Sequence, residues 1–140
     1  MIGAMWQRRR VVQGYANWCR EDEAPNRHSW AADRMARLVA AKPEQATRVI
    51  LEVARLLREN ERHALHSLGA DAMEAVLGDH FERTWPRISA EALSLPQVAT
   101  ALEDVELMPD EDAAEAVGTL LAKLGRKPVW RDEGRPTVDE

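Results

Sequence analysis

The 140-residue chain has few of the residues from which disulfides, zinc clusters and β-sheets are built. Its one cysteine, Cys19, excludes an intramolecular disulfide and a cysteine-based zinc cluster. One Phe, one Tyr and no alternating Val, Ile and Thr argue against strands. No apolar run approaches the roughly 20 residues that cross a bilayer, and MIGAMWQRRRVV at the start lacks the apolar core of a secretory signal. We therefore expect a cytoplasmic protein that makes no use of a membrane.

Motifs that carry catalysis are also missing from the chain. There is no glycine-rich phosphate loop and no nucleophile elbow. His63 and His66 are three residues apart, so on a helix they could share a face and bind a metal, with further ligands from elsewhere. Cys19 and His28 could form a nucleophile and its base, but Cys19 falls on an apolar stripe, where a free thiol packs as a small hydrophobic group. We expect no catalytic residue and no cofactor, and keep a metal-dependent enzyme using His63 and His66 as an alternative.

What the chain does have is apolar residues at helical spacing over most of its length. The clearest stripe lies within residues 43–57, and Trp18 and Trp30 fit inward positions of earlier helices. Capping residues and prolines predict where helices begin: Ser29, Pro43, Asp71, Thr84, Pro96 and Asp110. Glycine predicts where two of them end: Gly69 and Gly125. We predict an all-α protein, a single compact bundle of about seven short helices or stacked helical hairpins over residues 1–125, followed by a tail over residues 126–140.

Charge is distributed unevenly along the chain, which has a net charge of −5. Residues 1–62 contain 12 Lys and Arg against 8 Asp and Glu, whereas residues 63–140 contain 7 against 16. The stretch EDVELMPDEDAAE, residues 103–115, holds seven carboxylates and no basic residue. Four of the seven lie at a predicted helix start, where the helix dipole favours them. The other three, Glu103, Asp104 and Glu106, end the preceding helix, where nothing in the local sequence compensates them. They form either a partner surface or a solvated cluster whose repulsion solvent and salt keep small.

The basic residues form one short run, Arg8 to Arg10, at the start of the chain. Three successive arginines on a helix do not share one face. The rest of a nucleic-acid footprint is missing, and the acidic second half would repel phosphate. A nucleic-acid-associated regulator is therefore a disfavoured alternative.

Part of the chain resembles a family of small bacterial all-helical domains of uncharacterised function. The family pattern has W-A before a helix, P-E-x-A at the next helix, and A-G-P-L-E-x-L-L further on. Trp30-Ala31, Pro43-Glu44-x-Ala46, and Ala70 with Glu74 and Leu77 match it, whereas Asp71-Ala72 replaces the Gly-Pro pair. The resemblance covers residues 18–105, implies an all-α domain and brings no known activity.

Small size, acidity and the lack of a catalytic motif favour a non-catalytic protein-binding domain. The most concrete hypothesis is an immunity or antitoxin-like protein, which would mask a basic partner through an acidic face. Trp130 would serve as an anchor, since Trp is enriched at binding hot spots. We expect the following contact residues: Glu103, Asp104, Glu106, Asp110, Glu111, Asp112 and Trp130. The sequence alone predicts no oligomeric state.

Overall fold

The computed structural model describes residues 2–108 and 112–129, with side chains from residue 7 onward. These residues form eight α-helices and one π-helical turn: α1 (Ile2–Arg20), α2 (Ser29–Ala41), α3 (Pro43–Leu56), α4 (Arg62–Leu68), η1 (Gly69–Met73), α5 (Glu74–Asp79), α6 (Phe81–Ser94), α7 (Pro96–Leu102) and α8 (Asp112–Lys123). Within these ranges there is no strand, so the predicted all-α fold is confirmed. None of the described helices is both long and apolar enough to span a bilayer.

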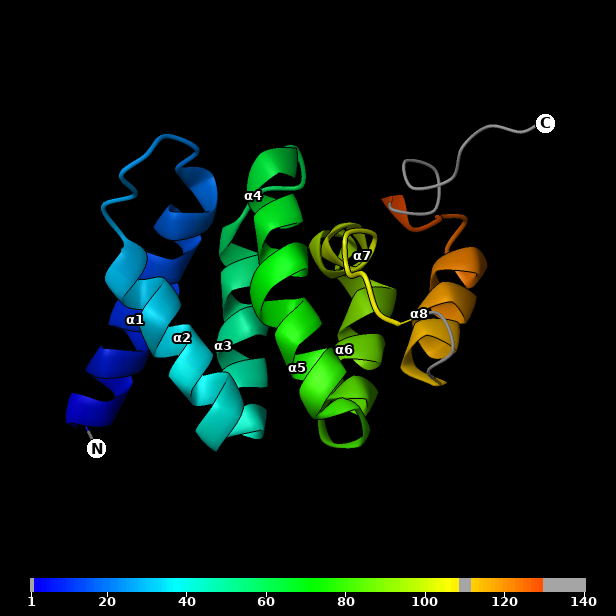
Figure 1. Cartoon of the computed structure of the whole chain (residues 1–140), viewed down its shortest axis with the longest axis horizontal. Coiled ribbons are helices and arrows are strands. Elements are labelled where there is room, and N and C mark those ends of the chain that lie inside the picture. Colours follow the sequence, from blue (N-terminus) through cyan, green and yellow to red (C-terminus); the bar gives the residue numbers. More distant parts are fainter. Residues whose placement is uncertain (1, 109–111, 130–140) are drawn as a thin grey trace.

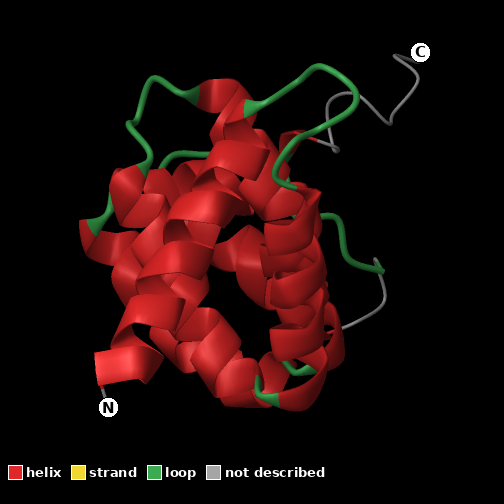
Figure 2. Cartoon of the chain, turned by 90° about the vertical axis from the view of Figure 1, so that its left-hand side faces the viewer, coloured by secondary structure: helices red, strands yellow, loops and turns green. Residues whose placement is uncertain are grey.

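The helices follow one another along the longest axis of the molecule in nearly the order of the chain (Figure 1). α1 and α2 lie at one end of this axis and α8 lies at the other. Most helix contacts join neighbours or next-but-one neighbours in the chain, as in stacked helical hairpins. Figure 2, which views the molecule from the α1 end, shows the loops gathered around the ends of the helices.

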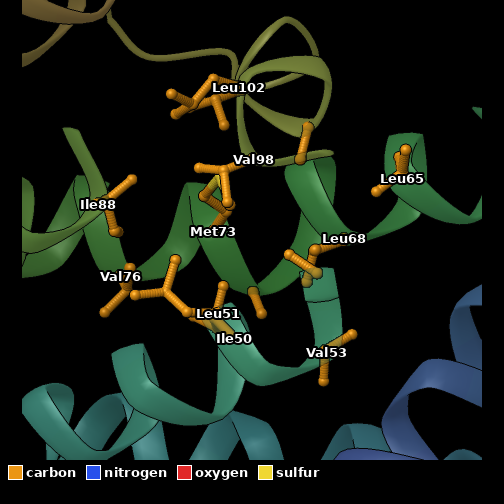
Figure 3. Close-up of a cluster of buried hydrophobic side chains, with 14 of the residues drawn as sticks. Ile50, Leu51, Val53, Leu65, Leu68, Met73, Val76, Ile88, Val98 and Leu102 are labelled. Atoms are coloured by element: carbon orange, nitrogen blue, oxygen red, sulfur yellow. The ribbon is translucent and has the colours of Figure 1, made fainter. Parts of the chain in front are cut away.

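α3 is the central helix of the core because its apolar residues repeat at helical spacing on a broad face. Ile50, Leu51 and Val53 of α3 are at most 1% exposed, and Figure 3 shows Ile50 and Leu51 beside Val76 of α5. Full burial of a side chain of this size contributes about 1.5–3 kcal/mol. Leu56 falls within the apolar stripe of residues 43–57 but is 40% exposed at the last position of α3, whereas Leu57 is buried.

One continuous helix stands where two were expected, since α4, η1 and α5 follow without a break (Figure 1). The prediction that Asp71 caps a helix start is therefore wrong. Its carboxylate accepts a hydrogen bond from the Tyr15 hydroxyl of α1, with the two oxygens 2.5 Å apart. The same hydroxyl accepts a hydrogen bond from the backbone N–H of Ala72 over 3.2 Å. A side chain from α1 thus supplies partners inside a π-helical turn, an irregularity that often accompanies functional sites.

Gly69 does not end a helix, contrary to expectation, but allows two helices to approach closely. A Cβ atom at this position would overlap the backbone carbonyl of Ala101 in α7. Because glycine has no side chain, η1 packs directly against the α7 backbone. Gly125, by contrast, is a helix stop as predicted: its φ is +72°, and the N–H of Arg126 donates to the Leu121 carbonyl over 2.8 Å.

Two expected capping residues lie inside helices instead. α6 begins at Phe81, so the prediction of Thr84 as a cap is wrong; its hydroxyl donates to the His80 carbonyl within the helix. Ser29 is the first residue of α2, and its hydroxyl donates to the Asn26 carbonyl, so it is not a side-chain cap. The proline starts were right, since Pro43 and Pro96 open α3 and α7.

The two tryptophans expected in the core are less buried than predicted. Trp18 is half-buried and stacks on Tyr15, with ring centroids 5.2 Å apart. Trp30 is 41% exposed, because Ala31 and Met35 occupy the buried face of α2. An exposed aromatic of this size is a surface feature that the helical stripe did not reveal.

The Gly69 contact predicts a large effect from one methyl group. Gly69→Ala should lower the free energy of unfolding by about 1–3 kcal/mol, because the added carbon overlaps backbone that cannot easily move. Gly78→Ala is the matched control in the same helix, since the nearest atom to its added carbon would be 3.8 Å away. That variant should be neutral or gain up to about 1 kcal/mol of helix propensity. Urea unfolding followed by circular dichroism measures both, and equal midpoints would contradict the close contact.

Candidate functional site

The described part of the acidic run divides into two groups, and both carboxylates of the first, Glu103 and Asp104, have side-chain partners within the chain. Glu103 pairs with Arg126 over 2.6 Å and with Arg62 over 3.8 Å. Asp104 lies 2.6 Å from Nδ1 of His66. The side chains of Glu103 and Asp104 are only 13% and 8% exposed. These two carboxylates therefore do not form the uncompensated cluster that the sequence suggested.

Glu106 belongs to the second, uncompensated part. It is exposed and forms no ion pair with the part of the chain that the structure describes. Its backbone N–H donates to a carboxylate oxygen of Glu74 over 2.8 Å. Burial raises the pKa of Glu74, and the charges of Glu106 and Asp71 raise it further, although the Glu106 N–H lowers it. Like charges therefore meet at this point without a basic side chain between them.

Asp112 and Glu115 line a groove of about 390 Å³ between α6 and α8. Both are exposed, and neither makes an ion pair with a described residue. Their spacing places them on one face of the first turn of α8. Lys123 also lines the groove. It lies about 12 Å beyond Glu115 along the helix axis, given the helical rise of about 1.5 Å per residue. The groove is thus acidic at the start of α8 and basic at its end.

An aromatic wall faces these carboxylates across the groove. Trp85 of α6 lines it and stacks on Phe81, with ring centroids 5.5 Å apart. Hydroxyls of Ser89 and Thr119 and the apolar side chain of Leu120 complete the lining with Ala116. An aromatic face beside carboxylates is suited to a cationic side chain, which can contact both. Sequence analysis missed Trp85, although its spacing of four residues from Phe81 and Ser89 was a usable signal.

Three predicted contact residues, Asp110, Glu111 and Trp130, lie outside the described residues. The tail expected from residue 126 begins attached to the body. Arg126 donates to Glu103 and to the Thr100 hydroxyl, and the N–H of Val129 donates to the Glu103 carbonyl over 2.7 Å. These bonds hold the end of α8 against the end of α7.

The two histidines considered as metal ligands belong to no larger ligand cluster in the described part of the chain. His66 is bonded to Asp104, and His63 is exposed one helical turn earlier. Across residues 2–108 and 112–129, no three His, Cys, Asp or Glu side chains converge as a metal site requires. The described geometry gives no support to the metal-enzyme alternative.

Cys19 and Tyr15 form a buried polar pair beside η1. Both are 0% exposed. Burial raises the pKa of Cys19 far above its usual range, and the charge of Asp71 raises it further. Burial also raises the pKa of Tyr15, with Cys19 and Asp71 adding to the effect. A protonated, buried thiol is a poor nucleophile, so this pair supports packing and not catalysis.

Comparison of the chain with family models, curated protein sequences and solved structures gives no match. The resemblance of residues 18–105 to a bacterial domain family therefore stays a prediction. The function has to be argued from the fold and from the α6–α8 groove.

The buried pair predicts that stability falls in alkali. The folded-state pKa values of Cys19 and Tyr15 lie above their unfolded values of about 8.5 and 10. The unfolded chain therefore releases these protons first, and the stability that both groups contribute at neutral pH is lost as pH rises. Urea unfolding between about pH 8 and 11 should show this decline, and Cys19→Ala and Tyr15→Phe should each make it shallower. Parallel curves for both variants and the wild type would contradict the assignment.

The ion pair between Arg126 and Glu103, which we call the clasp, predicts a second effect on stability. Arg126→Ala should cost about 1–3 kcal/mol, because a mostly buried carboxylate loses its charged partner. Arg27→Ala is the control, since Arg27 is 82% exposed in its ion pair with Glu21 and should cost under about 1 kcal/mol. Urea midpoints compare the two, and a larger loss at Arg27 would argue against the clasp.

Proposed function

We propose that this chain is a non-catalytic protein-binding domain whose acidic end receives a basic partner. The observation that carries the proposal is the α6–α8 groove, where Asp112 and Glu115 line the same space as Trp85 and have no ion-pair partner among the described residues. Charges without internal partners weaken the fold slightly but speed and orient association with a charge of opposite sign. Trp at the centre of such a surface supplies apolar area for the bound state.

The proposal also includes Glu106, which is exposed and has no ion-pair partner among the described residues. Glu103 and Asp104 contribute less, because a partner would first have to displace Arg126 and His66. Asp110 and Glu111 stay in the proposal because they directly precede Asp112 in sequence. Trp130 stays because it follows Val129, whose N–H donates to the Glu103 carbonyl. The finer proposal is an immunity or antitoxin-like role in a bacterial cytoplasm, in which this surface masks a cationic toxin.

A capture experiment with matched variants tests the proposed function. Asp112→Lys with Glu115→Lys reverses two groove charges, whereas Asp22→Lys with Glu23→Lys makes the same change at exposed residues of the α1–α2 loop. A true partner should be retained by the wild type and the loop variant and lost by the groove variant. With the purified partner, the groove variant should slow association at least about tenfold at low salt.

The immunity-like role has its own readout. Co-expression of the wild type and the loop variant should restore growth that the captured protein inhibits, and the groove variant should not. Equal capture by all three proteins would remove the groove from the proposal.

A further inference from the structure

A second surface of opposite charge lies at the other end of the molecule. Trp30, Arg34 and Arg37 are spaced four and three residues apart, so they form one exposed row along α2, which we call the α2 ridge. Within the described part of the chain, neither arginine makes an ion pair. Asp33 is the one acidic residue of α2 and leaves the ridge with a positive balance.

The ridge is built into the fold and is not a loose set of side chains. A Cβ atom on Gly14 of α1 would lie 2.5 Å from the Trp30 ring, so the ring packs against bare backbone. Arg10 of α1 places its guanidinium 5.0 Å from the centroid of the Trp30 ring, a distance suited to a cation–π contact. Trp and Arg are the residues most enriched at the energetic centres of protein interfaces. A packed but exposed Trp, beside arginines that have no ion-pair partner in the described ranges, therefore has the composition of an interaction surface.

The chemistry that fits this ridge is present on the molecule itself. α2 and α8 lie at opposite ends of the longest axis (Figure 1), so one chain cannot join its own ridge to its own groove. A second copy can. We infer that the α2 ridge of one molecule docks at the α6–α8 groove of another, with Arg34 and Arg37 facing Asp112 and Glu115. This inference rests on the proposed function to the extent that both use the carboxylates of the groove.

Such docking joins different surfaces of identical chains, so it is head to tail and leaves a free ridge and a free groove at the two ends. It also connects with the proposed function, because a basic partner and a second copy compete for the same carboxylates. A long polyanion fits the ridge less well, since the remainder of the chain is acidic and would repel it.

Sedimentation of the full-length chain tests the inference. At about 20 mM salt the average mass should rise with protein concentration, and the association constant should fall at least about tenfold at about 300 mM salt. Arg34→Glu with Arg37→Glu should abolish the association, as should Asp112→Arg with Glu115→Arg. Asp22→Arg with Glu23→Arg changes the net charge as the groove variant does and should leave the association intact.

The decisive experiment mixes two variants: the ridge variant, Arg34→Glu with Arg37→Glu, and the groove variant, Asp112→Arg with Glu115→Arg. Each alone presents like charges to itself, but in the mixture every ridge meets a groove of opposite sign, so association should return. A chain that stays monomeric at low salt, or variants whose mixture does not associate, overturns the inference. Binding of duplex DNA by a monomer that is lost on Arg34→Glu with Arg37→Glu overturns it in favour of nucleic acid.

A hepta-arginine peptide separates the two proposals. A monomeric wild type that binds the peptide, and loses it on Asp112→Arg with Glu115→Arg, overturns the docking of a second copy and leaves the proposed function standing. Restored association of the mixed variants, with no peptide bound by the wild type, supports the docking and counts against a foreign basic partner.

Discussion

Contacts on two sides fix the helix of residues 62–79, and the positions of the carboxylates that follow α7 depend on these contacts. On one side the Tyr15 hydroxyl bonds Asp71 and Ala72 inside the π-helical turn; on the other, Gly69 lets the turn pack against the Ala101 carbonyl. α7 continues from Ala101 to the carboxylates that follow it, and their partners Arg62 and His66 lie on the clamped helix. A backbone contact thus decides which charges can meet, because it fixes the distance between α7 and α4.

The fold was predictable from sequence where the signal is local. Helical spacing marked α3, and prolines marked the starts of α3 and α7, because each acts through the geometry of its own turn. The prediction failed at Gly69 and Asp71. Their local sequence is the same whether Gly69 ends a helix and Asp71 caps the next one, or Gly69 contacts the α7 backbone and Asp71 bonds Tyr15 of α1. Only the tertiary contacts of Gly69 and Asp71 distinguish these two structures, as is common at irregular sites.

The candidate site shows the same division between local and distant information. The seven carboxylates of residues 103–115 were visible in sequence. Which of the described ones have partners within the described chain was not. Glu103 is compensated by Arg126, 23 residues later, and Asp104 by His66, 38 residues earlier. Trp85 is part of the site because α6 and α8 line the same groove. The helical periodicity of neither helix predicts that the two lie together. Charge composition therefore predicted the sign of the surface, whereas the fold decides which residues present it.

The polar groups of the described residues fall into two classes, one buried and one exposed. Groups that a catalyst would expose and activate, the thiol of Cys19 and the phenol of Tyr15, are buried and held protonated as packing around η1. Charges that have no partner among residues 2–108 and 112–129 lie instead on open surfaces at opposite ends of the molecule, at the α2 ridge and the α6–α8 groove. Such charges add little to the stability of the fold, but they extend the reach of the surface to a Debye length, about 8–10 Å at physiological salt. Their physical effect is therefore felt before contact, in the rate and orientation with which another macromolecule approaches each end.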